Sequence, residues 1–355
     1  MTRIALALAL SLSLSGAALA QPPKPAPSAK HAPSPKEAPA AKSAPSPNIG
    51  SPLFGEAGMA PRDSLPPPLP PRADGVPADM AFGAYQRGNF LYALMEAERR
   101  LDANSKDAAA MTLIGEIYRD GAAVPRDDHA AAEWFRLASN LGDPQAAYEL
   151  GALLLQGANG VKKDPAGAET QFERAAAKNL HGALYNLGVM ALQGMDGKTP
   201  DYAKAAQYFL RAANAGDDDA AYSYGVMLRD GKGVAMNIAE AVRWLKRAAD
   251  DGVIAGQVEY AIMLFNGEGV PRDEAGAAKI LLTAAARGNP IAQNRVAHLY
   301  ARGEALPKDL AKAAAWNSFA KAAGLKDNEL DVETANLTPE ERSRFTKMVH
   351  EIAGF

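Results

Sequence analysis

The sequence predicts an all-α fold, a right-handed solenoid of about six helix pairs with capping helices, preceded by a disordered Pro-rich tether. Two observations lead to this prediction. A pattern of small residues and glycines recurs every 36 or 37 residues from position 108 onward, and a fixed period in this range is typical of helical arrays. Residues 21–79 hold 17 of the 25 prolines, a composition that buries too little apolar surface to offset the entropy of ordering.

The first twenty residues have the pattern of a secretory signal peptide. Arg3 precedes an apolar run from Ile4 to about Leu14, and small residues from Ala18 to Ala20 form a cleavage site. The apolar run is shorter than the roughly 20 residues of a membrane span, so a retained anchor is the weaker interpretation. We therefore expect cleavage after Ala20 and a periplasmic or secreted chain with no membrane span in its mature form.

The net charge and the cysteine content argue against nucleic-acid binding and thiol chemistry. The formal net charge is −3, and this mild acidity argues against nucleic acid as a partner. The chain has no cysteine, so it has neither a disulfide framework nor a thiol nucleophile, and its stability must come from packing.

The Pro-rich segment of residues 21–79 is expected to be a disordered linker with evenly spaced positive charges. Its composition favours polyproline II. One interpretation is a weak contact with the cell wall or another anionic surface, and the other is a solvated spacer. The charges recur every six residues, at Lys24, Lys30, Lys36 and Lys42.

Each repeat has a small marker residue and a glycine six residues after it. The spacings between markers are 36, 37, 37, 36 and 36. We expect a first helix around the marker, a glycine turn, a second helix, and a residue at the C-cap that tolerates the left-handed conformation. The small marker should let the second helix approach closely. The markers are Gly115, Gly151, Gly188, Gly225, Ala261 and Ala297, and the predicted core residues of the second helices are Trp134, Phe135, Phe172, Phe209, Trp244, Leu245 and Trp316.

Segments such as Ala183–Gly194 and Ala239–Gly252 resemble the two helices of a Sel1-like repeat, a relative of the tetratricopeptide repeat. The resemblance covers residues 108–325 in six units. Residues 80–107 resemble a degenerate tetratricopeptide unit and are expected to form an N-terminal cap. Residues 326–355 should contain a C-terminal capping helix, and an array with both ends capped is expected to be a monomer.

The C-terminal capping helix has a clear start signal. Thr338 has the side chain of an N-cap, Pro339 stands at the first helical position, and Glu341 follows three residues after the threonine. This spacing predicts a capping box.

No catalytic, metal or cofactor site is predicted, and we expect a protein that is not an enzyme. The five histidines include no pair four residues apart on one helical face. Gly194–Thr199 ends like a phosphate-binding loop, but Leu192 stands where that loop needs glycine. Asp217–Asp219 lacks the pattern of a calcium loop and is better explained by a helix N-cap. Paired carboxylates for acid–base chemistry are not singled out by their context.

Two polar rows on the first helices are the candidate partner-binding residues. They lie two positions before and five positions after each marker, and residues seven apart share one helical face. We expect them to line a concave groove that binds a protein or peptide of the cell envelope. The alternative is an ordinary solvated face. The rows are Glu149, Asn186, Ser223, Glu259 and Arg295, and Gln156, Gln193, Asp230, Asn266 and Arg302.

The resemblance implies an exported protein–protein interaction scaffold or adaptor. Exported Sel1-like proteins often act in envelope signalling, so a periplasmic regulator of a sensor kinase or exopolysaccharide pathway is one alternative. Cysteine-rich relatives have been linked to penicillin binding and β-lactam hydrolysis, which implies a cell-wall-associated or β-lactam-hydrolase-like enzyme as another. The lack of cysteine and of a Ser-x-x-Lys nucleophile with its partner motifs argues against that enzyme.

Overall fold

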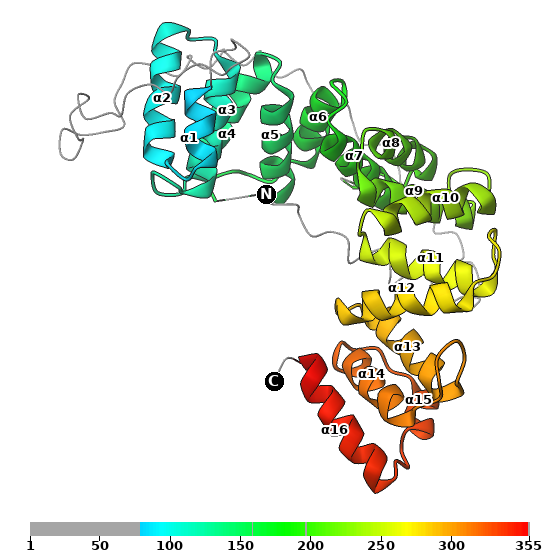
Figure 1. Cartoon of the computed structure of the whole chain (residues 1–355). Helices are drawn as coiled ribbons and strands as arrows, with labels where there is room; N and C mark the ends of the chain where they lie inside the picture. Colours follow the sequence, from blue (N-terminus) through cyan, green and yellow to red (C-terminus); the bar gives the residue numbers. More distant parts are fainter. Residues whose placement is uncertain (1–78, 158, 196, 354–355) are drawn as a thin grey trace, which may run out of the picture. The chain divides into compact units, whose positions relative to one another are not determined.

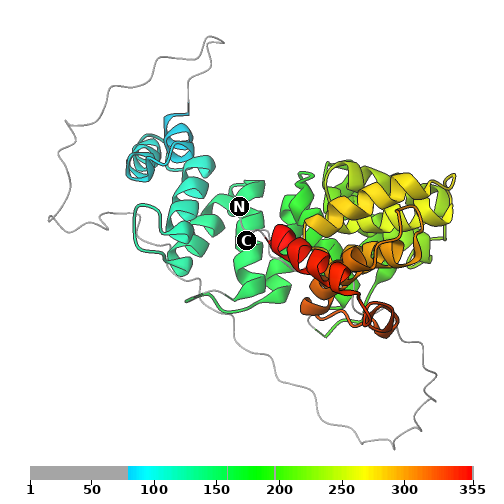
Figure 2. The same cartoon turned by 60° about the horizontal axis from the view of Figure 1, so that its bottom comes forward.

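The computed structural model describes residues 79–157, 159–195 and 197–353, and every regular element in these ranges is an α-helix. The predicted all-α class is therefore confirmed. Figures 1 and 2 show successive helices packed as pairs. The predicted signal peptide, and the predicted tether except Asp79, lie outside the described residues.

Six helix pairs form the repeat array, and we number them repeats 1 to 6 in chain order. Within each repeat the first helix packs on the second, and each second helix also packs on the first helix of the next repeat. The pairs are α3 (Ala108–Asp120) with α4 (Asp128–Asn140), α5 (Pro144–Gln156) with α6 (Pro165–Ala176), α7 (His181–Gln193) with α8 (Tyr202–Asn214), α9 (Asp218–Asp230) with α10 (Ile238–Asp250), α11 (Ile254–Asn266) with α12 (Glu274–Ala286), and α13 (Pro290–Arg302) with α14 (Leu310–Ala322).

Two helices flank the array at each end. The helices α1 (Met80–Gln86) and α2 (Phe90–Ala103) precede it, and α15 (Asn328–Glu333) and α16 (Pro339–Ala353) follow it. The predicted capping box of α16 is present. The Thr338 backbone N–H donates to the Glu341 carboxylate at 2.9 Å, and the Glu341 backbone N–H donates to the Thr338 hydroxyl at 3.2 Å.

Aspartate and asparagine start most of the helices. Their side-chain oxygens accept hydrogen bonds from backbone N–H groups of the first turn, which would otherwise lack partners. The predicted cap role within Asp217–Asp219 is confirmed, because Asp217 accepts from the Ala220 N–H at 2.9 Å. The caps within the array are Asp107, Asp127, Asp143, Asp164, Asp201, Asp217, Asn237, Asp273, Asn289 and Asp309.

The small markers allow the two helices of a repeat to approach closely, as predicted. A Cβ atom placed on Gly188 would lie 2.7 Å from the ring of Phe209, closer than real side chains pack. Phe209 is completely buried. In repeat 5 the equivalent pair is Ala261 and Leu281, so a larger marker accompanies a smaller core residue.

Two of the predicted core residues differ from the prediction. Phe135, Phe172, Phe209 and Leu245 are completely buried and Trp316 nearly so. In contrast, Trp134 and Trp244 are only half-buried. Each of these tryptophans precedes a buried core residue by one position, and one position turns a side chain by about 100° around the helix.

Arginines near the ends of second helices connect neighbouring repeats. Arg211 donates to the Ala176 carbonyl oxygen at 3.2 Å, and Arg287 donates to the Gly252 carbonyl oxygen at 3.0 Å. Both acceptors lie at or just beyond the C-terminal end of the preceding second helix. A cation is favourable there because the helix dipole places partial negative charge at that end.

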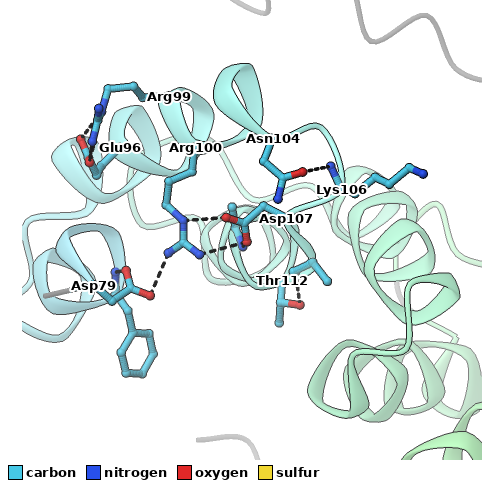
Figure 3. A network of polar contacts seen from close by, with 11 residues as sticks. Asp79, Glu96, Arg99, Arg100, Asn104, Lys106, Asp107 and Thr112 are labelled. Carbon is cyan, nitrogen blue, oxygen red and sulfur yellow. Dashed lines mark hydrogen bonds and ion pairs between the residues drawn. The ribbon is translucent and has the colours of Figure 1, made fainter. Parts of the chain in front are cut away.

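Arg100 on α2 joins the start of α1 to the start of α3. Its guanidinium donates to Asp107 at 2.9 Å from both Nε and Nη2, and to Asp79 at 2.8 Å (Figure 3). Asp79 and Asp107 are the N-caps of α1 and α3. One guanidinium therefore fixes two helix starts at the beginning of the array.

Candidate partner-binding surface

The row five positions after the markers is the most accessible part of the first helices. All five predicted residues of this row are exposed, and so is Asp120, which holds the same position in repeat 1. Asp230 accepts from Arg229 at 2.7 Å and Arg302 donates to Glu329 at 2.8 Å. In the described part of the chain, the side chains of the remaining residues of the row make no hydrogen bond or ion pair: Gln156, Gln193 and Asn266.

The row two positions before the markers lies closer to the junctions between repeats. Glu149 accepts from Arg119 of repeat 1 at 2.5 Å, and Glu259 forms an ion pair with Arg229 of repeat 4. Ser223 is buried and donates to a backbone carbonyl of its own helix at 2.8 Å. Two members of this row have no hydrogen-bond or ion-pair partner within the described residues: Asn186, which is half-buried, and Arg295, which is exposed.

The junctions of repeats 1 and 2 and of repeats 4 and 5 share one arrangement of charges. Arg119 lies between Asp120 of its own helix and Glu149 of the next repeat. Arg229 lies in the same way between Asp230 and Glu259. Although burial opposes the charge, the carboxylates raise the pKa of both arginines above the ordinary value.

The ten predicted residues therefore fall into two groups. One group is already engaged by the protein itself, and consists of Glu149, Ser223, Asp230, Glu259 and Arg302. The other group keeps its polar atoms available to a partner, and consists of Gln156, Asn186, Gln193, Asn266 and Arg295.

A third row, one position after the markers, was missed by the sequence analysis. It is apolar in the four middle repeats and ionisable at both ends of the array. The burial of its members ranges from half-buried to buried. We call Ala152, Val189, Val226 and Ile262 the apolar floor, and Glu116 and His298 are its two ends. The floor and the two polar rows together form the first-helix surface.

The two ends of the floor differ in their polar contacts. Glu116 is half-buried, and its carboxylate makes no hydrogen bond or ion pair among the described residues. Burial raises the pKa of Glu116 to about 7, against the opposing effect of Arg119. His298 instead contacts Asp327 through Nε2 at 2.8 Å. The sequence signal for Glu116 was a carboxylate at a position where four other repeats carry apolar residues.

Three further observations concern metal ligands, membrane spans and the Gly-Lys-Thr segment. Within residues 79–353, apart from the two gaps, no three His, Asp or Glu side chains are grouped as metal ligands. No helix in the same ranges combines the length and apolar character needed to cross a membrane. The Gly-Lys-Thr segment lies in the connection between α7 and α8, as expected for a turn between two helices.

Comparison with known proteins identifies the repeats. The family model described as Sel1 repeat matches residues 108–143, 144–180, 181–217, 218–253, 254–289 and 290–325. No curated protein matches the chain.

Two solved structures share the fold. One is a protective antigen of uropathogenic Escherichia coli with an SLR fold (TM-score 0.65, 22% identity, 79% of this chain covered); the chain spans 58% of that protein's length. The other is a Sel1 repeat protein from Oxalobacter formigenes (TM-score 0.59, 28% identity), with 68% of this chain and 98% of that protein covered. Sel1-repeat proteins generally mediate protein–protein interaction. With six consecutive matched repeats over more than half of its length, the chain belongs to the Sel1-repeat family.

Proposed function

We propose that this chain is an exported interaction scaffold or adaptor of the bacterial cell envelope, and that it holds a partner protein or peptide on the first-helix surface. The signal-peptide pattern of residues 1–20 supports export. The family supports a binding function, since helical arrays present extended surfaces.

One observation carries the choice of surface. Half of the predicted polar residues already have hydrogen-bond or ion-pair partners within the chain, but the other half keep their side-chain hydrogen-bonding groups available beside an apolar floor. Polar side chains without hydrogen bonds inside the chain, next to partly exposed apolar side chains, suit recognition of a polypeptide, which supplies both hydrogen bonds and apolar side chains.

The test is affinity capture from an envelope extract with the full chain and two triple variants. The surface variant carries Asn186→Ala, Asn266→Ala and Arg295→Glu, none of which removes a side-chain hydrogen bond or ion pair within the described residues. The control variant carries Gln207→Ala, Asn214→Ala and Arg243→Glu, which are exposed residues of second helices.

We expect a discrete partner to be retained by the wild type and the control variant and lost by the surface variant. All three proteins should have the same circular dichroism spectrum and thermal stability. Retention by the surface variant and loss by the control variant would move the binding site to the second helices and contradict the proposal.

Export is tested separately by fractionating bacteria that express the full chain and sequencing the N-terminus of the protein recovered. We expect the mature chain in the periplasm or medium, beginning after Ala20. Recovery of the uncleaved chain in the cytoplasm would contradict this part of the proposal and leave the binding surface unaffected.

A further inference from the structure

We propose that the partner of the first-helix surface is a polypeptide segment that places apolar side chains on the floor and a lysine or arginine against Glu116. This inference rests on the proposed function, because it names the kind of partner that the same surface holds. It depends on two observations: the floor is apolar, and the carboxylates at its repeat 1 end include one without a paired cation.

The floor favours apolar side chains over polar ones. Ala152, Val226 and Ile262 are only half-buried, and Val189 keeps 8% of its surface exposed. These residues occupy the same position in four consecutive repeats. Covering them with apolar groups removes apolar surface from water at roughly 25 cal/mol per Å², whereas covering them with polar groups leaves those groups without hydrogen bonds.

Charge complementarity places a cation at the repeat 1 end. Three carboxylates are present there, Glu116, Asp120 and Glu149, and the neighbouring cation of α3 is Arg119. Arg119 is bound on both sides, by Asp120 at 2.9 Å and by Glu149 at 2.5 Å. Asp120 also accepts from the Tyr85 hydroxyl at 2.7 Å. Glu116 alone of the three carboxylates lacks a hydrogen-bonding partner in the described structure.

A carboxylate in this position favours a cation from outside the chain. A half-buried carboxylate loses hydration when it ionises, and an ammonium or guanidinium group within hydrogen-bonding distance compensates that loss. The pKa of Glu116 is raised to about 7 because burial outweighs the attraction of Arg119, which agrees with a carboxylate that lacks a directly paired cation. The opposite end of the floor carries His298, whose Nε2 contacts Asp327. Its buried Nδ1 has no hydrogen-bond partner in the described structure, but this end offers no unpaired carboxylate to a cation.

The probe is a library of random linear peptides displayed on phage and selected on the immobilised full chain. An enriched peptide is then synthesised with lysine and with acetyl-lysine, which removes the positive charge and keeps the alkyl chain. Its Kd is measured against the wild type, Glu116→Gln and Glu173→Gln. Glu173 is an exposed residue of α6 and serves as the matched control.

We expect enriched peptides in which lysine or arginine adjoins an apolar run. Glu116→Gln should weaken binding of the lysine peptide about tenfold or more, as loss of a charge-assisted hydrogen bond implies, while Glu173→Gln leaves the Kd unchanged. The acetyl-lysine peptide should bind equally weakly to the wild type and to Glu116→Gln.

Two other outcomes overturn the inference and are distinguishable. If enriched peptides lack a cation, or bind Glu116→Gln as tightly as the wild type, but are lost with the surface variant, the proposed function stands and the partner chemistry is wrong. If no peptide is enriched, or if the surface variant binds every enriched peptide as the wild type does, both proposals fail.

Discussion

Arg119 on α3 donates to Glu149 on α5 at 2.5 Å, and so connects the first helices of repeats 1 and 2. Arg229 and Glu259 repeat this contact between repeats 4 and 5, in the same register of the repeat. Both contacts use glutamates of a row that the sequence assigns to partner binding. Glu149 and Glu259 therefore connect neighbouring repeats, whereas the unpaired residues of the same row remain available to a partner.

The Arg229 junction predicts a stability effect. Arg229→Met leaves Glu259 and Asp230, whose side chains are about a quarter exposed, without their cation. We expect the free energy of unfolding to fall by about 1 to 3 kcal/mol. Urea unfolding of Arg229→Met, Glu259→Gln and the double variant measures the coupling. Strictly additive effects of the two substitutions would show that the pair does not stabilise the junction.

The close contact between the marker and the core residue predicts that a smaller core residue offsets part of the destabilisation caused by a larger marker. Gly188→Ala forces a Cβ atom to within 2.7 Å of the Phe209 ring, and overpacking of this kind costs about 1 to 3 kcal/mol. Adding Phe209→Leu reproduces the natural pair of Ala261 and Leu281 in repeat 5, so it should restore part of the loss. Thermal unfolding of the single and double variants checks this. If the double variant loses as much stability as the two single variants lose together, the close contact between Gly188 and Phe209 is contradicted.

Glu116 predicts a pH dependence of stability. Its pKa is raised from 4.5 to about 7, so between these values the folded chain binds more protons than the unfolded chain. Glu116 therefore makes folding less favourable as the pH rises through this window. Arg119, Asp120, Glu149 and Asp143 are the charged groups that influence it.

Glu116→Gln removes this titration. Relative to the wild type, the variant should gain stability by on the order of 2 kcal/mol between about pH 5 and about pH 8. Urea unfolding at the two pH values measures the change. An identical difference between variant and wild type at both values would mean that Glu116 is hydrated like a surface carboxylate.

The contacts of Asp327 predict that its carboxylate stabilises the C-terminal end of the array. One of its oxygens caps α15, and the other contacts His298 and Asn294, each at 2.8 Å. Burial opposes its ionisation, but these hydrogen bonds lower the pKa of Asp327 to about 2. Its stabilising contribution is therefore present above about pH 4 and is lost as the pH falls toward 2.

Asp327→Ala should lower the free energy of unfolding at neutral pH by about 2 to 3 kcal/mol. Asp201→Ala is the matched control, because Asp201 caps α8 and its side chain is exposed. The control should cost about 1 kcal/mol. Equal losses for the two variants would show that the contacts of Asp327 to His298 and Asn294 contribute nothing.

Much of the fold could be predicted because its determinants are local. The marker glycines, the N-cap aspartates and the capping box of Thr338 and Glu341 each act within one helix or one helix pair, and their spacing is visible in the sequence. The half-buried state of Trp134 and Trp244 was not predicted, since two large side chains in succession both look like core residues in a sequence pattern.

The candidate surface could be predicted only in part. Periodicity places Glu149 and Gln156 on one helical face, but it does not show that Arg119, 30 residues earlier in the chain, engages Glu149. Glu116 lacks a paired cation because Arg119 binds Glu149 instead, and the sequence does not show this either. Contacts between repeats depend on how neighbouring helices pack, and this is fixed by the whole array.

The most direct test of the central claim is photo-crosslinking of the full chain inside the cells that express it. The crosslinking amino acid p-benzoylphenylalanine replaces Gln193 on the first-helix surface, or Gln207 on the second helix of the same repeat; both side chains are exposed. We predict a discrete protein adduct from position 193 and none from position 207. An adduct from position 207 alone would contradict the assignment of the first-helix surface as the binding site.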